Sequence, residues 1–192
     1  MIADQIRRRV RAVGKRLVRQ GLVHSCVGNI SARDGDRIII SATGAMLDQL
    51  DGGSLLEIPI GTEPLPWNVS RDTYLHAAIY HATNAGAIVH THSPYAVAES
   101  LGALDPVLDA PDVEGAMVLK GIPVVDSGEP ERLAGECVEA LRGHPAIIVR
   151  GHGVIAVGAT VEDAFVMASF VEHACMVRHL ARGAVREQAP SR

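Results

Sequence analysis

Three histidines of this chain follow apolar segments, at positions where their side chains can meet. His90 and His92 come after the apolar run 87–89, and His152 lies between two glycines after the apolar run 146–149. Residues two apart on a strand point to the same face, so the first two imidazoles are expected to lie together. An H-x-H pair alone is a weak signal, because a solvated pair at a strand end explains it equally well.

Taken together, the three histidines indicate a specific kind of metal site. Three protein ligands with one open position are typical of catalytic zinc, whereas structural zinc sites are closed and usually contain cysteine. Imidazole also binds iron, cobalt, nickel and copper, so Zn²⁺ is the first expectation and another divalent transition metal is an alternative. The three cysteines of the chain form no C-x-x-C motif, and their odd number indicates ordinary thiols in a reducing compartment.

A carboxylate stands near the start of a helix that the apolar spacing predicts from about residue 70 to residue 81. This residue, Asp72, could serve acid–base chemistry, but a carboxylate in a first helical turn also complements the helix dipole. From the residues alone the two interpretations carry about equal weight. His76 lies four residues later on the same helix face, where a packing or hydrogen-bonding role is favoured over that of a fourth metal ligand.

The elements that must position these residues alternate between strand and helix patterns without a linker or an internal repeat, which predicts one α/β domain. Several strands are short and hairpin-like, so a mixed or antiparallel sheet is expected rather than a doubly wound parallel one. A capping-box pattern at Thr160 predicts a helix to about residue 182, followed by a loose polar tail. Segments 28–31 and 102–114 are expected to be loops.

Composition excludes several classes of function. The chain has 192 residues, 47% of them hydrophobic and 3% aromatic, which suits one compact domain. A formal net charge of −4 gives no electrostatic footprint for nucleic acid. No apolar segment is long enough to span a membrane, and the first residues lack the apolar core of a signal peptide. A cytoplasmic protein with a small-molecule substrate is therefore expected, with neither nucleic acid nor membrane as a partner.

Five short segments resemble the class II aldolase/adducin family, whose zinc-dependent members include L-fuculose-phosphate aldolase and L-ribulose-5-phosphate 4-epimerase. They occur in family order and at family-like spacing between about residue 5 and residue 182. The segments are Gly28-Asn29-Ile30-Ser31, Ser41-Ala42-Thr43-Gly44, Ser70-Arg71-Asp72 with His76 and Ile79-Tyr80, His90-Thr91-His92-Ser93, and Gly151-His152-Gly153.

The resemblance implies an α/β fold in which a central, mainly antiparallel sheet is flanked by helices in three layers. It implies one such domain over residues 1–183, with 184–192 as the loose tail. It also implies a homotetramer whose active sites lie at subunit interfaces.

The resemblance further implies that His90, His92 and His152 are the zinc ligands and that Asp72 is the catalytic acid/base. The phosphate-using relatives hold the substrate phosphate with a GN loop, a TG turn and a pair of serines. Here the matching positions are Asn29, Thr43, Gly44 and Ser70, with Arg71 in place of the second serine. A guanidinium can grip phosphate or carboxylate in bidentate fashion, so Arg71 is a further candidate for anion binding.

The implied function is that of a zinc-dependent lyase, most directly an aldolase, that cleaves or forms a C–C bond of a small, phosphorylated hydroxy-carbonyl compound. Its chemistry would pass through a metal-stabilised enediolate. Decarboxylation, epimerisation and dehydration use the same intermediate and remain alternatives. A non-catalytic, adducin-like module is disfavoured, because a scaffold has no reason to keep three ligands, an acid and an open metal position.

Overall fold

The computed structural model describes residues 2–63 and 65–187, and the centre of this part of the chain is an eight-stranded sheet. The strand order is β3-β2-β1-β4-β8-β7-β6-β5, and every pairing is antiparallel except that of β6 with β7. The mainly antiparallel sheet expected from the sequence is confirmed. The strands are β1 (Asn29–Asp34), β2 (Arg37–Ser41), β3 (Leu55–Pro59), β4 (Ala87–Thr91), β5 (Val107–Leu108), β6 (Ile122–Val125), β7 (Ala146–Val149) and β8 (Gly153–Gly158).

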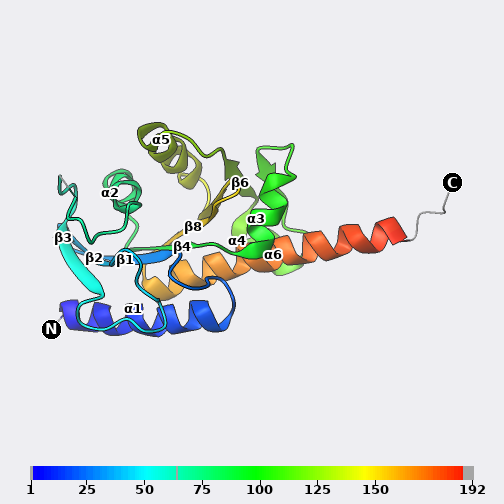
Figure 1. Ribbon diagram of the computed structural model, residues 1–192. Coiled ribbons are helices and arrows are strands. Elements are labelled where there is room, and N and C mark those ends of the chain that lie inside the picture. The colour runs from blue at the N-terminus through cyan, green and yellow to red at the C-terminus, as the bar shows by residue number, and fades with distance from the viewer. Residues whose placement is uncertain (1, 64, 188–192) are drawn as a thin grey trace.

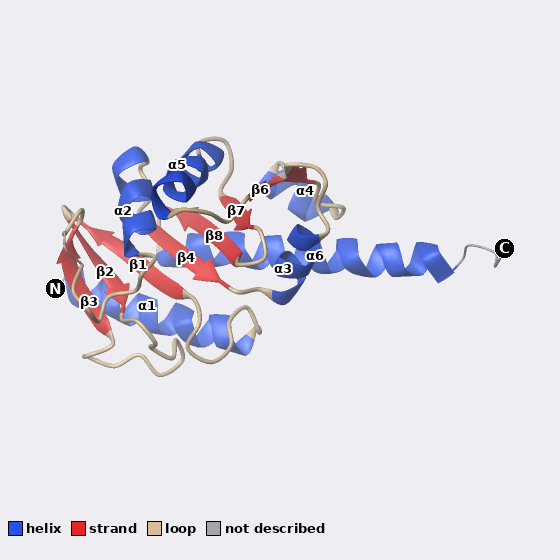
Figure 2. Cartoon of the chain, turned by 45° about the horizontal axis from the view of Figure 1, so that its top comes forward, coloured by secondary structure: helices blue, strands red, loops and turns tan. Residues whose placement is uncertain are grey.

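Helices cover both faces of this sheet, which gives the expected three layers (Figure 1). One face carries α2 and α5, and the other carries α1 and α6, with α3 and α4 packed against α6 (Figure 2). The bounds are α1 (Ile2–Arg19), α2 (Thr73–Ala82), α3 (Pro94–Leu101), α4 (Val113–Leu119), α5 (Pro130–Leu141) and α6 (Val161–Glu187). Among the described residues, no helix combines the length and the apolar character needed to cross a membrane.

The central strand β4 shows how the sheet divides the core in two. All five of its residues are buried, and successive side chains point to opposite faces. Val89 packs in the apolar cluster that includes residues of α1 and α6, whereas Ile88 packs in the cluster that includes residues of α2 and α5. Because side chains alternate in this way, the imidazole of His90 points to the same face of the sheet as Ile88, towards α2 and α5.

Three local predictions differ from the structure. Residues 29–31 lie in β1, paired with both β2 and β4, although the polar start of this strand resembles a loop. The predicted loop 102–114 contains β5 and the first residues of α4. The last helix continues through Gly183 to Glu187, since one glycine costs a helix only about 1 kcal/mol and good helix formers follow it. Residues 184–187 of the expected loose tail are thus helical, and the remainder, 188–192, lies outside the described residues.

Candidate active site

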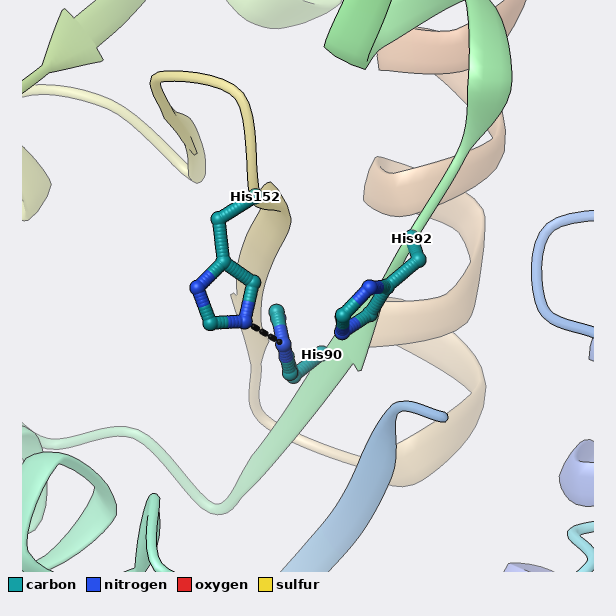
Figure 3. A group of neighbouring side chains, drawn as sticks. All are labelled: His90, His92 and His152. Atoms are coloured by element: carbon teal, nitrogen blue, oxygen red, sulfur yellow. Dashed lines mark hydrogen bonds between the residues drawn. The ribbon is translucent and has the colours of Figure 1, made fainter. Parts of the chain in front are cut away.

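The three histidines singled out from the sequence converge in space, as Figure 3 shows. His90 is the fourth residue of β4, His92 directly follows that strand, and His152 lies in the turn between β7 and β8. One ligand nitrogen from each ring lies within 4.8 Å of the other two. Nε2 of His90 is 3.1 Å from Nε2 of His152. The expected metal ligands therefore form one cluster.

Close backbone packing holds the third histidine against the first two. Strands β4 and β8 are antiparallel neighbours, with His90 opposite Ile155. The turn that carries His152 has Gly151 in the left-handed region, at a φ of 69°. A Cβ atom added at Gly153 would overlap the carbonyl oxygen of Thr91, so only glycine lets the β7–β8 turn approach the end of β4 so closely. Glycine is therefore favoured at both positions that flank His152, by the backbone conformation at Gly151 and by the close packing at Gly153.

The ring orientation of His90 suits a metal ligand. Its Nδ1 lies 3.0 Å from the carbonyl oxygen of Val154. A carbonyl only accepts hydrogen bonds, so Nδ1 carries the proton and Nε2 presents its lone pair to the cluster. Metal-bound histidines commonly donate their second ring nitrogen to a backbone carbonyl in this way. The donor set therefore fits a divalent transition metal such as zinc.

The charge state of the cluster also suits metal binding, which requires neutral imidazoles. Burial lowers the pKa of His92 to about 4, and the neighbouring His90 and His152 add to this effect. Burial likewise lowers the pKa of His90, although Asp72 opposes the shift. Both rings are therefore neutral at neutral pH and need not lose a proton before a metal binds.

The carboxylate of Asp72 faces the histidine cluster rather than the helix that it precedes. Asp72 is the N-cap residue of α2, yet its side chain makes no capping hydrogen bond. Instead Oδ2 accepts a hydrogen bond of 2.7 Å from Nδ2 of Asn29 and lies 3.8 Å from Nε2 of His90. Burial favours a higher pKa for Asp72, but His90, His76 and the bond from Asn29 outweigh it and lower that pKa. The group is an ionised base at neutral pH.

A cavity of about 210 Å³ opens beside these groups, between α2, α5 and the sheet. Apolar side chains of α2, α5, β7 and β8 form much of its wall. Its polar lining comes from Asp72, Tyr74, His76, His90, Ser127 and His152. A small organic molecule has room here next to both the carboxylate and the histidine cluster.

Sequence reasoning did not assign His76 to the site, although its position four residues after Asp72 places both on one face of α2. The imidazole is fully buried, with Nδ1 2.7 Å from the hydroxyl of Ser31. That hydroxyl is in turn 2.8 Å from the hydroxyl of Tyr80. The expected hydrogen-bonding role is thus present, but Nε2 of His76 has no partner among the described residues.

The residues expected to bind an anion fall into two groups. Asn29 and Ser70 are buried beside Asp72, and Nδ2 of Asn29 also reaches Oγ of Ser70 at 3.2 Å. Both amide hydrogens of Asn29 are then engaged, so this side chain has no free donor for an anion. Its Oδ1 is buried and has no hydrogen-bond partner among the described residues. The role of these residues in anion binding stays a prediction.

The second group lies at the protein surface. Thr43, Gly44 and Arg71 are exposed, and Gly44 has a φ of 70°. An isolated bridge between Ala42 and Val69 brings this turn next to Ser70. The exposed residues therefore lie next to the buried pair, Asn29 and Ser70.

A family model described as the Class II Aldolase and Adducin N-terminal domain matches residues 8–179. The chain belongs to this family. Among solved structures, L-fuculose-1-phosphate aldolase from Thermus thermophilus superposes with a TM-score of 0.86 and 31% sequence identity. The alignment covers 95% of this chain and 96% of that one, so the class II aldolase fold extends over nearly the whole chain.

Two curated relatives of this chain have different activities in their names. An L-fuculose phosphate aldolase of Methanococcus maripaludis is 31% identical over 159 residues, which cover 80% of this chain and 84% of that protein. A probable bifunctional methylthioribose-1-phosphate isomerase/methylthioribulose-1-phosphate dehydratase of Nocardia farcinica is 30% identical over 190 residues. That match covers 87% of this chain but only 34% of the longer Nocardia protein. The chain is an enzyme of the class II aldolase superfamily.

Proposed function

We propose that the chain is a divalent-metal-dependent aldolase that forms or cleaves a C–C bond in a small, phosphorylated hydroxy-carbonyl compound. The observation that carries this proposal is the position of Asp72. Its carboxylate leaves the N-terminus of α2 uncapped and faces the histidine cluster, 3.8 Å from Nε2 of His90. A base beside a metal-ligand set is the arrangement needed to remove a proton next to a carbonyl group.

His90, His92 and His152 would hold the metal, with zinc as the favoured ion. A bound divalent metal would supply a Lewis acid that polarises the substrate carbonyl. Asp72 would take the proton from the carbon next to that carbonyl. This carbon would then attack the aldehyde carbon of the second substrate, and the aldehyde oxygen would take up one proton as Asp72 gives up its own. In the cleavage direction the same carboxylate returns the proton. Asn29 would hold the carboxylate in place, and the apolar wall of the cavity would limit the access of water.

The anionic group of the substrate would lie outside the cavity, at the N-terminus of α2. Ser70, Thr43 and Gly44 offer hydroxyl and backbone N–H donors there, and the exposed Arg71 offers a guanidinium. The helix N-terminus itself favours negative charge.

A dehydratase is the second candidate, because methylthioribulose-1-phosphate dehydratase is part of the name of the Nocardia relative. Dehydration begins with the same proton abstraction by Asp72 and differs in expelling a hydroxide from the neighbouring carbon. Decarboxylation and epimerisation would use the same groups.

We also propose that the chain assembles as a homotetramer. Exposed apolar side chains occur on α3, in the loop after it and on α4, and they include Leu101, Leu104, Val113 and Met117. The helices α3 and α4 lie at the same end of the sheet (Figure 2). Light scattering after size-exclusion chromatography would test this, and a monomer at micromolar concentration would contradict it.

The test of the function uses zinc-loaded protein and dihydroxyacetone phosphate in heavy water, with the C3 proton signals followed by NMR. Exchange that requires both zinc and Asp72 is the expected result. Asp72→Asn should abolish it, whereas Asp36→Asn, on the exposed β1–β2 turn, should not. Absence of exchange with zinc bound would contradict an aldolase that uses this donor, and methylthioribulose 1-phosphate would then test the dehydratase.

A further inference from the structure

Of the three clustered histidines, His92 is the one that the sheet holds least. It directly follows β4, whose last pair in the ladder with β8 joins Thr91 to Val154. His90, by contrast, lies within this ladder, and its ring donates a hydrogen bond to the carbonyl oxygen of Val154. Within the described part of the chain, the ring of His92 makes no hydrogen bond. The position of this ring therefore depends on the backbone on either side of it.

Helix α3 begins two residues after His92, and a side chain of α6 holds its first turn. The N-cap residue, Ser93, makes no side-chain capping hydrogen bond. Instead, Oε1 of Glu172 accepts a hydrogen bond of 3.0 Å from the backbone N–H of Tyr95, and Oε2 accepts one of 2.9 Å from that of Ala96. A carboxylate at this place satisfies backbone donors that a helix leaves free, and it complements the helix dipole. Glu172 thus anchors the start of α3 on α6.

The short connection between β4 and α3 is packed so that it moves with the helix. Thr91 and Ser93, on either side of His92, are both fully buried. Their hydroxyl oxygens are 2.8 Å apart, which joins the end of the strand to the N-cap of the helix. A shift of the first turn of α3 would therefore be passed on to His92.

The other end of α3 contacts the turn that carries the third histidine. The backbone N–H of Gly151 donates a hydrogen bond of 3.0 Å to Oγ of Ser100, and the guanidinium of Arg150 donates to the carbonyl oxygen of Ser100. His152 directly follows Gly151 in this turn. Helix α3 therefore connects the segments that carry His92 and His152, whose ring centroids are 4.8 Å apart.

An ion pair holds the second half of α3 on α6 independently of Glu172. Glu99, which is 4% exposed, pairs with Arg178 at 3.1 Å between Oε2 and Nε. Loss of the Glu172 carboxylate should therefore release only the end of α3 that adjoins His92. Metal–ligand distances lie within about 0.2 Å of fixed values, so a small displacement of one ligand weakens binding.

We propose that Glu172 is a positioning residue of the metal site. By anchoring the first turn of α3 on α6, it holds His92 where this ring and that of His152 can ligate the same metal ion. The inference rests on the proposed function, in which the histidines hold the metal. It adds a residue that lies outside both the cavity and the histidine cluster to those that determine metal affinity.

The first experiment measures the zinc affinity of the chelator-treated protein by competition with a chromophoric chelator. Glu172→Leu removes both acceptor oxygens, and Glu172→Gln keeps one of them. We expect the Kd for zinc to rise about tenfold in Glu172→Leu, as is usual when a residue that supports a metal ligand is lost, and to rise less in Glu172→Gln.

The matched controls are Glu162→Leu and Glu162→Gln. Glu162 is another carboxylate of α6 that ties this helix to a neighbour, because both of its oxygens accept hydrogen bonds from Arg9 of α1. These variants should lower the Tm of the metal-free protein and leave the Kd for zinc unchanged.

The second experiment distinguishes a displaced ligand from a general loss of stability. The visible absorption of bound Co²⁺ depends on the geometry of its ligands. This spectrum should change in Glu172→Leu and match the wild type in Glu162→Leu. A Glu172→Leu protein with a lower Tm but the wild-type Kd and the wild-type cobalt spectrum would overturn the proposal. If Glu172→Leu does not fold, Glu172→Gln decides the question, and an unchanged Kd in that variant would overturn the proposal.

These measurements need no turnover, which separates the inference from the function on which it rests. A wild type that binds zinc but does not exchange the protons of dihydroxyacetone phosphate would contradict the aldolase, and the zinc affinities would still decide the role of Glu172. A wild type that binds no zinc would overturn both the metal-dependent function and the role of Glu172.

Discussion

Asn29 and Asp72 are 43 residues apart in the chain, yet the amide of Asn29 donates a hydrogen bond of 2.7 Å to the carboxylate of Asp72. Asn29 is the first residue of β1 and stands opposite His90 of β4 in the sheet. The pairing of two strands therefore fixes the donor that orients the candidate base. This relationship ties the position of the base to the position of a metal ligand.

Replacement of Asn29 by alanine should impair catalysis without removing a catalytic group. Loss of a hydrogen bond that orients an active-site group typically reduces activity about 10- to 100-fold. The same bond lowers the pKa of Asp72, so its loss should raise that pKa. We expect kcat to fall in this range and the acid limb of its pH profile to move to higher pH.

The control for this variant is Asn84→Ala, in the exposed loop after α2, which should leave both quantities unchanged. An Asn29→Ala enzyme with a reduced kcat but an unmoved acid limb would mean that Asn29 does not act through Asp72.

The histidine cluster should bind one metal ion per chain. A ligand that binds only the folded state at 1,000 times its dissociation constant stabilises that state by about 4 kcal/mol. Added zinc should therefore raise the Tm of the chelator-treated protein by several degrees. His152→Ala should lose this response, whereas His173→Ala, exposed on α6, should retain it. Metal analysis and thermal unfolding measure both effects, and a zinc-dependent rise in His152→Ala would place the metal elsewhere.

Some of this arrangement could be predicted because it depends on local patterns. The two-residue spacing of His90 and His92 on a strand predicted that their rings would lie together, and the position of all three histidines after apolar segments predicted one metal site. These patterns act over a few residues, and tertiary contacts reinforce them. The resemblance to a known family predicted what these local patterns do not, namely a central sheet between two layers of helices.

The orientation of Asp72 could not be predicted in the same way. A carboxylate at a helix start serves equally well as a cap or as a base, and the choice depends on Asn29, which the sequence placed in a loop. The hydrogen bonds of His76 depend likewise on Ser31 and Tyr80, which only the packing of α2 on β1 brings together. Relationships that cross from one element to another need the fold itself.

The stability of the metal-free protein should depend on pH through His76. Burial lowers its pKa from 6.5 to about 4 in the folded state. Between these values the unfolded chain takes up a proton that the folded protein does not, so the free energy of unfolding decreases as the pH falls from 6.5 to 4. Below pH 4 the protein has lost the full contribution of His76 to its stability, on the order of 3 kcal/mol. Well above pH 6.5 the imidazole is neutral in both the folded and the unfolded state, and no stability is lost.

Comparison with His76→Gln isolates this effect, because the other histidines titrate in both proteins. Urea unfolding at pH 7 and at pH 4.5 should show a larger loss of stability in the wild type than in the variant. Equal losses would mean that His76 titrates normally in the folded protein.

Gly153→Ala tests whether the close approach of the β7–β8 turn to β4 builds the metal site. The new Cβ would overlap the carbonyl oxygen of Thr91, and neither backbone segment can move without disturbing a central strand of the sheet. We expect a loss of about 3 kcal/mol in the free energy of unfolding together with weaker zinc binding, because the displaced turn carries His152. Gly143→Ala is the matched control, since its Cβ would meet no atom within 4 Å, and it should change the stability by less than about 0.5 kcal/mol. If Gly153→Ala bound zinc as tightly as the wild type, the position of His152 would not depend on this contact.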